Sequence, residues 1–218
     1  MASLGTRLLL TVLAAFLALT ASGQGQLLHE GDLLFCSSDT ANAITAVTSG
    51  VDGLPIDHVA VVHRIGGDQG PLFVIEAVKP CVRLTPINDF LEENALVIVG
   101  RVGLADFDVR LSVRHCLAMV GKPYDDLYLP GDSAVYCSEL VQMNYVTRAN
   151  KQIFGTIPMS FHDESGQITD YWTDFYARHG MTVPEGEPGT NPGELSRRPQ
   201  VSILGTIDEN KKLQSLTP

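Results

Sequence analysis

The sequence predicts a single α+β domain in which an antiparallel sheet packs against helices. Short runs rich in β-branched residues alternate with longer segments whose apolar residues recur at three- and four-residue steps. Two of the β-branched runs, His58–Ile65 and Leu72–Val78, are separated by a segment rich in glycine, which predicts a hairpin. A chain of 218 residues has the length of one domain, and its core does not need disulfides or metal to fold.

The N-terminal segment, residues 1–23, has the order of a secretory signal peptide. A charged start ends at Arg7, an apolar run covers Leu8–Thr20, and small residues precede Gln24. The alternative is a transmembrane anchor, which would need roughly 20 apolar residues. We therefore expect cleavage near Gln24 and an exported protein, periplasmic or secreted, whose single domain covers residues 24–218.

Strands and helices are predicted from turn residues and apolar spacing. The predicted strands are short apolar runs bounded by turn signals: Asp32–Phe35, His58–Ile65, Leu72–Val78 and Leu96–Val102. The predicted helices have helical spacing or strong stop signals: Thr40–Ser49, Pro86–Asn94, Asp108–Gly121, Ser133–Asn150 and Ile168–His179. The segment from about 183 to 218 is rich in proline and glycine, which predicts an extended, loop-like tail.

The charge balance excludes two classes of partner. The chain has 15 Lys and Arg against 25 Asp and Glu, a net charge of −10. Nucleic acid binding requires a basic surface that displaces counterions, and anionic lipids also attract basic segments. We expect no nucleic acid partner and no stable membrane span in the mature protein.

The four cysteines do not have the spacing of a metal site. No C-x-x-C motif occurs and no cysteine has a histidine at ligand spacing, so we expect no structural zinc and no other metal. An exported protein can form disulfides, and Cys36, Cys81 and Cys116 are either core thiols or members of one bridge. Five histidines in unrelated contexts are interpreted as surface or packing residues: His29, His63, His115, His162 and His179.

Cys137 differs from the other cysteines because it lies near a predicted helix start. With Asp132 or Ser133 as the N-cap, Cys137 falls in the first turns of the helix. The free N–H groups and the dipole of a helix start favour a thiolate over a thiol, and the same N–H groups can receive an oxyanion. The alternative is a buried core thiol, because cysteine is among the most buried residue types.

A thiol nucleophile needs a base and a group that orients the base. His58 begins a predicted strand after a turn, and Glu76 lies in the next strand between Ile75 and Ala77. A carboxylate in an apolar strand is costly unless it is paired, so Glu76 is expected to accept a hydrogen bond from the His58 ring. The alternatives are an exposed turn histidine and a single charge on the solvent face.

Five short motifs in this order carry a resemblance to a known family. They are Gly31–Phe35 (GDLLF), Asp57–Ala60 (DHVA), Ile75–Ala77 (IEA), Gly121–Asp125 (GKPYD) and Tyr136–Leu140 (YCSEL). The chain from about Gly31 to Phe161 resembles the YiiX/YebB-like proteins, which are circularly permuted, papain-fold members of the NlpC-type cysteine peptidase superfamily. The resemblance implies a permuted papain-like fold, in which the histidine precedes the cysteine along the chain.

The resemblance also implies a role for each matching residue. Cys137 corresponds to the nucleophile, His58 to the base and Glu76 to the orienting residue; such sites are defined by geometry rather than by chain order. Tyr124 and Tyr136 are the implied substrate-binding residues. The family pattern does not account for Cys36, which is expected beside the site either as a packing residue or as a partner in a regulatory disulfide.

The function implied is a cysteine peptidase or amidase that needs no cofactor. The thiolate would attack the carbonyl of a peptide or other small amide, with cell-wall muropeptides as one substrate class, and water would resolve the thioester. Two alternatives remain open. One is a lipid-directed acyltransferase or phospholipase with the same Cys–His pair, and the other is a non-catalytic binding module.

Overall fold

The computed structural model describes residues 28–218 with the exception of 38–39, 68, 132, 209–212 and 215–218. The predicted signal peptide, residues 1–23, lies outside the described residues. Within the described part of the chain, no helix combines the length and the apolarity that crossing a membrane requires.

A seven-stranded sheet forms the centre of the molecule, and every neighbouring pair in it is antiparallel. Its order is β4-β3-β2-β1-β5-β8-β9. The strands are β1 (Leu33–Ser37), β2 (Ile56–Arg64), β3 (Leu72–Ala77), β4 (Val82–Pro86), β5 (Leu96–Val102), β8 (Val201–Ile207) and β9 (Leu213–Gln214). A separate two-stranded ribbon pairs β6 (Ile157–Pro158) with β7 (Pro188–Gly189).

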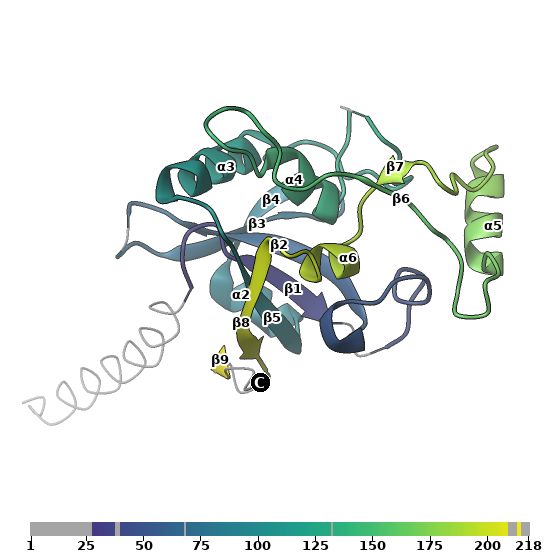
Figure 1. Cartoon of the computed structure of the whole chain (residues 1–218), viewed down its shortest axis with the longest axis horizontal. Coiled ribbons are helices and arrows are strands. Elements are labelled where there is room, and N and C mark those ends of the chain that lie inside the picture. Colours follow the sequence, from purple (N-terminus) through teal and green to yellow (C-terminus); the bar gives the residue numbers. More distant parts are fainter. Residues whose placement is uncertain (1–27, 38–39, 68, 132, 209–212, 215–218) are drawn as a thin grey trace, which may run out of the picture.

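Helices cover both faces of the sheet, and one further helix packs in a separate aromatic cluster. They are α2 (Ile87–Glu93), α3 (Asp106–Ala118), α4 (Cys137–Asn144), α5 (Asp170–Arg178) and α6 (Pro192–Ser196), with a short 3-10 helix η1 (Val51–Gly53). Figure 1 shows α3 and α4 together above the strands, and α5 at the far end of the molecule beyond the β6–β7 ribbon.

The strands alternate between two cores because successive side chains point to opposite faces. One core joins Leu33 and Phe35 of β1 to residues of α3, α4 and α6. The other joins Leu34 and Cys36 of β1 to Phe90 and its neighbours on α2. Near-continuous apolar strands of this kind are expected where both faces of a sheet are covered.

The structure confirms the hairpin and most predicted elements but corrects others. The β2–β3 hairpin is present, with Val61 opposite Ile75. The predicted helix at Thr40–Ser49 is wrong: the described part of this segment forms only turns, with one i to i+4 bond from Ala46 N to Asn42 O. The β4 strand, which has only five residues, was not predicted.

The prediction of a loop-like tail beyond Val183 is also wrong. This segment contributes α6 to the core and the seven-residue strand β8 to the sheet, where β8 pairs with β5. The proline and glycine content was misleading because Pro192 occupies the first turn of α6, and Asn191 caps it by accepting from Glu194 N at 2.6 Å.

We expect the C-terminal segment to contribute to stability as a core element. Leu195 is fully buried, so Leu195→Ala should lower the free energy of unfolding by about 2–4 kcal/mol in urea denaturation. Ser202→Ala, at an exposed position of β8, is the control and should cost less than about 0.5 kcal/mol. Equal, small losses for both variants would contradict the assignment of α6 to the core.

Candidate active site

Cys137 is the first residue of α4, which places it closer to the helix start than the sequence predicted. The N-cap is Tyr136, with extended backbone angles and no side-chain capping bond, so the predicted N-cap at Asp132 or Ser133 is wrong. The helix starts late because Val135 is still in extended pairing: Val135 N donates to Pro123 O at 2.9 Å. It also ends at Asn144 rather than at residue 150.

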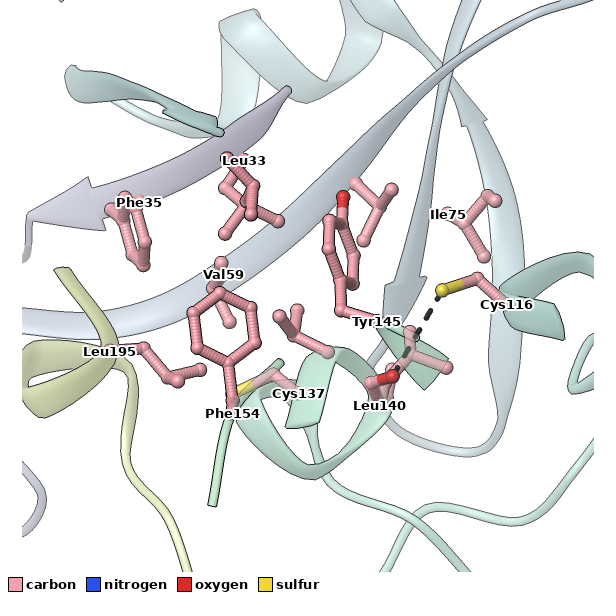
Figure 2. Close-up of a cluster of buried hydrophobic side chains, with 14 of the residues drawn as sticks. Leu33, Phe35, Val59, Ile75, Cys116, Cys137, Leu140, Tyr145, Phe154 and Leu195 are labelled. Carbon is pink, nitrogen blue, oxygen red and sulfur yellow. Dashed lines mark hydrogen bonds between the residues drawn. The ribbon is translucent and has the colours of Figure 1, made fainter. Parts of the chain in front are cut away.

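The Cys137 side chain is buried within the core under α4. It is 4% exposed and belongs to the cluster that contains Phe154 and Leu195. Figure 2 shows it at the beginning of the α4 ribbon, with Leu140 one turn further along. At this position the first N–H groups of the helix have no partner within the helix, and they carry positive partial charge.

His58 is presented by an irregularity at the start of β2. Cys36 of β1 is opposite His58, but the next residue, Ser37, is opposite Ile56, so Asp57 is an extra residue in the ladder. Such a bulge bends a strand locally and redirects its side chains. The Asp57 carboxylate accepts a 2.6 Å hydrogen bond from Asn42 Nδ2, which ties the bulge to the preceding loop.

Glu76 lies in β3, almost completely buried at 3% exposed, and its two oxygens have different partners. Oε2 is 2.9 Å from Nε2 of His58, which is the contact expected from the sequence. Oε1 accepts from Thr85 Oγ1 at 2.5 Å and from Arg83 Nε at 3.0 Å. Since Nε2 of His58 faces the carboxylate, Nδ1 is the ring nitrogen left for the thiol.

These contacts make His58 and Glu76 a charged pair at neutral pH. Burial alone lowers the pKa of His58, but hydrogen bonds with Cys137 and Glu76 outweigh it and raise the pKa to about 10. Burial raises the pKa of Glu76, but the hydrogen bond and charge of His58, with the bonds from Thr85 and Arg83, lower it to about 2. The arrangement holds an imidazolium between a carboxylate and a thiol.

Three tyrosine rings form a contact chain next to α4. Tyr128 packs edge-on against Tyr124, with ring centroids 6.5 Å apart, and against Tyr136 at 5.3 Å. The Tyr136 ring is buried, and its hydroxyl accepts from Thr190 N at 3.1 Å, so it holds the C-terminal segment against the start of α4. Substrate contacts of Tyr124 and Tyr136 stay predictions.

The other thiols are not bonded to the site residues, although, in addition to burial, the charges of Glu76 and Cys137 raise the pKa of Cys36, which lies beside them. All four cysteines are free, so no disulfide is formed among them. Cys36 lies opposite His58 on the neighbouring strand but packs in the α2-side core, whereas Cys137 packs in the α4-side core. Burial raises the pKa of Cys36 well above its usual value, as burial also does for Cys116, whose thiol points to Leu140 O in Figure 2. Cys36 and Cys116 are core thiols, which is one of the two interpretations that the sequence allowed.

Two features of the site were missing from the sequence analysis. Arg83 and Thr85 on β4 bind Glu76, but β4 is an edge strand of the sheet and was not predicted. Their alternation in the run Val82–Pro86 (VRLTP) was the available signal.

Other candidate sites are distinct from this one. Across the described residues, no group of three or more His, Cys, Asp or Glu side chains is arranged to hold a metal ion. An open hollow of about 1190 Å³ is lined at the opposite end of the sheet by residues that include Asp32, Arg64 and Arg101. Asp32 and Arg101 there form a bidentate ion pair of 2.7 and 2.8 Å.

Comparisons with known proteins identify the family and the fold. The family model of the permuted papain-like amidase enzymes YaeF/YiiX, family C92, matches residues 27–205. A search of curated proteins finds no match. Among solved structures, one described as the metalloprotein YiiX from Escherichia coli O157:H7 superposes with a TM-score of 0.66 at 21% identity, covering 85% of this chain and 98% of that one. That likeness shows the fold, and the family model covers most of the chain: the protein belongs to the YaeF/YiiX family of permuted papain-like amidases.

Proposed function

We propose that this amidase uses Cys137 as its nucleophile, His58 as its general acid and base, and Glu76 as the group that orients His58. One observation carries the proposal: Nε2 of His58 is 2.9 Å from Oε2 of Glu76, which leaves Nδ1 for the thiol at the first residue of α4. A nucleophile, a base and a third group that orients the base are the parts that thiol catalysis needs.

The proposed reaction is acyl transfer through a thioester. The Cys137 thiolate adds to the carbonyl carbon of an amide, and the C=O electrons move onto oxygen. As that oxyanion collapses, the C–N bond breaks and the leaving nitrogen takes the proton from the His58 imidazolium. Neutral His58 then removes a proton from water as the water oxygen adds to the thioester, and collapse of that intermediate releases a carboxylic acid and returns the Cys137 thiolate and the His58 imidazolium.

The start of α4 supplies the stabilisation that the oxyanion needs. The backbone N–H groups of Cys137 and Ser138 precede the first intrahelical bond, which Leu140 N makes to Tyr136 O at 2.9 Å. Donors fixed in advance around a developing negative charge contribute much of the rate enhancement of acyl transfer.

We further propose peptides and other small amides as substrates, with cell-wall-derived muropeptides as the class to test first. The support is the amidase family and the predicted export, which would bring the protein to the cell wall. Export rests on the sequence of residues 1–23, and N-terminal sequencing of the mature protein, expected to begin near Gln24, tests it.

The experiment is a substrate panel with matched variants. Purified protein is incubated with muropeptides, with short peptide amides and with a phospholipid ester, and released amine and released fatty acid are measured. We expect amine release that falls by roughly 1,000-fold or more in Cys137→Ala. The control Cys36→Ala, which removes a core thiol, should retain most of the activity of the folded fraction.

Two outcomes would contradict the proposal. Release of fatty acid without amine would identify a lipid-directed acyl hydrolase with the same Cys–His pair. Unchanged amine release in Cys137→Ala would show that this residue is not the nucleophile.

A further inference from the structure

The partners of Glu76 divide cleanly between its two oxygens. Oε2 is engaged by His58, whereas Oε1 receives three donors from β4: Nε of Arg83 at 3.0 Å, its Nη2 at 2.9 Å and Oγ1 of Thr85 at 2.5 Å. Glu76 and Arg83 are opposite each other in the β3–β4 ladder, so the backbone pairing itself brings them together. Because three donors from one strand hold Oε1 in place, the Glu76 carboxylate has little freedom to rotate.

The charged and titratable groups around this carboxylate come from five elements, of which β1 contributes Cys36, opposite His58. His58 belongs to β2, which also carries Asp57, and Arg83 belongs to β4. From α2, Glu93 reaches Nη2 of Arg83 at 3.5 Å, and the Cys137 thiol approaches His58 from α4. Arg83 is the cation of this group that does not belong to the Cys–His–Glu set.

We propose that Arg83 and Thr85 are positioning residues of the active site, which occupy Oε1 of Glu76 and so hold its Oε2 against Nε2 of His58. The inference rests on the proposed function of Cys137, His58 and Glu76 and extends it to the neighbouring strand. Neither residue touches the reacting atoms; both act through Glu76.

The chemistry explains why such a clamp is needed. A carboxylate has two equivalent oxygens, and the ring of a histidine presents the correct nitrogen to its target only while the other nitrogen is held. The guanidinium of arginine has a planar fork of donors that restrains a carboxylate in direction as well as in position. A buried hydroxyl at 2.5 Å restrains the same oxygen from a second direction.

The chain contains a matched ion pair for comparison. Asp32 is also almost fully buried and also pairs with an arginine of a neighbouring strand, Arg101 of β5, at 2.7 and 2.8 Å. It lies at the other end of β1 from His58. The side chains of the two arginines are 43% and 35% exposed, so we expect substitutions of them to perturb stability to a similar degree.

The test is a titration of the His58 ring by two-bond proton–nitrogen NMR, which reports both protonation and tautomer without any substrate. The His58 signals are assigned by their loss in His58→Ala. In Arg83→Gln we expect the titration midpoint of His58 to fall by at least one pH unit, and in Thr85→Val to fall by less. Arg101→Gln should leave the midpoint of His58 unchanged. Arg83→Lys keeps a donor and the charge, so its His58 midpoint should lie close to that of the wild type.

The direction in which the His58 midpoint moves in Arg83→Gln distinguishes a positioning role of Arg83 from a purely electrostatic one. Removing the Arg83 charge while Glu76 stays in place would raise the titration midpoint of His58, because the positive charge of Arg83 would no longer offset the negative charge of Glu76. A rise in Arg83→Gln, or no change in both β4 variants, would overturn the inference while leaving the proposed triad intact. A wild-type His58 that titrates near its ordinary pKa of 6.5 would instead overturn the proposed function, and this inference with it.

Discussion

At mildly acidic pH, iodoacetamide should alkylate Cys137 ahead of the other three thiols of the folded protein. We expect the neighbouring His58 ring and the free N–H groups at the start of α4 to make the Cys137 sulfur the most reactive of the four. Burial disfavours the thiolates of Cys36 and Cys116. Mass spectrometry of peptides after timed labelling measures the four rates separately.

Replacing the histidine should remove most of this selectivity. In His58→Ala, alkylation of Cys137 near pH 6 should slow by roughly 10- to 100-fold and recover as the pH rises toward the ~8.5 of a free thiol. His63→Ala is the control, because His63 lies on the same strand and also contacts a glutamate, Glu30, at 2.9 Å. Equal rates in the wild type and His58→Ala from about pH 5 to 9 would show that the two residues do not form a reactive pair.

The contact between His58 and Glu76 was accessible from sequence because local rules favour it. A hairpin turn made neighbours of two strands, and a carboxylate in an apolar strand required a partner. The start of α4 was predicted less well. Cap preference suggested Asp132 or Ser133, but pairing of Val135 with the Pro123 segment keeps the backbone extended up to Tyr136. Long-range pairing overrode the local signal.

The same limit explains the missing part of the fold. The β8 strand follows a segment rich in proline and glycine, and nothing local shows that Val201–Ile207 pairs with β5, about one hundred residues earlier in the chain. The helix predicted at Thr40–Ser49 failed for a related reason. Asn42 bonds to Ile44 N and Thr45 N and also to Asp57 at the bulge, which stabilises a turn rather than a continuing helix. In both segments, contacts with distant parts of the chain determine the backbone conformation.

Glu76 links the chemistry of the site to the stability of the fold. One residue balances the His58 charge, satisfies Thr85 and pairs with Arg83 across the β3–β4 ladder. A buried ion with several partners is costly to break, because removing one member leaves the others buried and unpaired. Catalytic and structural effects of a substitution at Glu76 should therefore appear together.

Glu76→Gln should destabilise the protein most in mildly acidic solution. The raised pKa of His58 contributes stability that is complete below 6.5 and lost as the pH rises through about 10. The lowered pKa of Glu76 contributes stability that is complete above 4.5 and lost as the pH falls through about 2. Between these limits the variant should lose about 2–4 kcal/mol of unfolding free energy, and the loss should shrink toward pH 10.

Urea denaturation at several pH values measures this difference, with Glu30→Gln as the matched control. Glu30 also pairs with a β2 histidine, but its side chain is 28% exposed, so its loss should cost about 1 kcal/mol or less. Glu76→Gln should also slow alkylation of Cys137 by roughly 10-fold at about pH 6, because the ring loses its orientation and the imidazolium its counterion, whereas Glu30→Gln should not. A difference in stability between wild type and Glu76→Gln that is independent of pH would mean that His58 and Glu76 are not an ion pair in the folded protein.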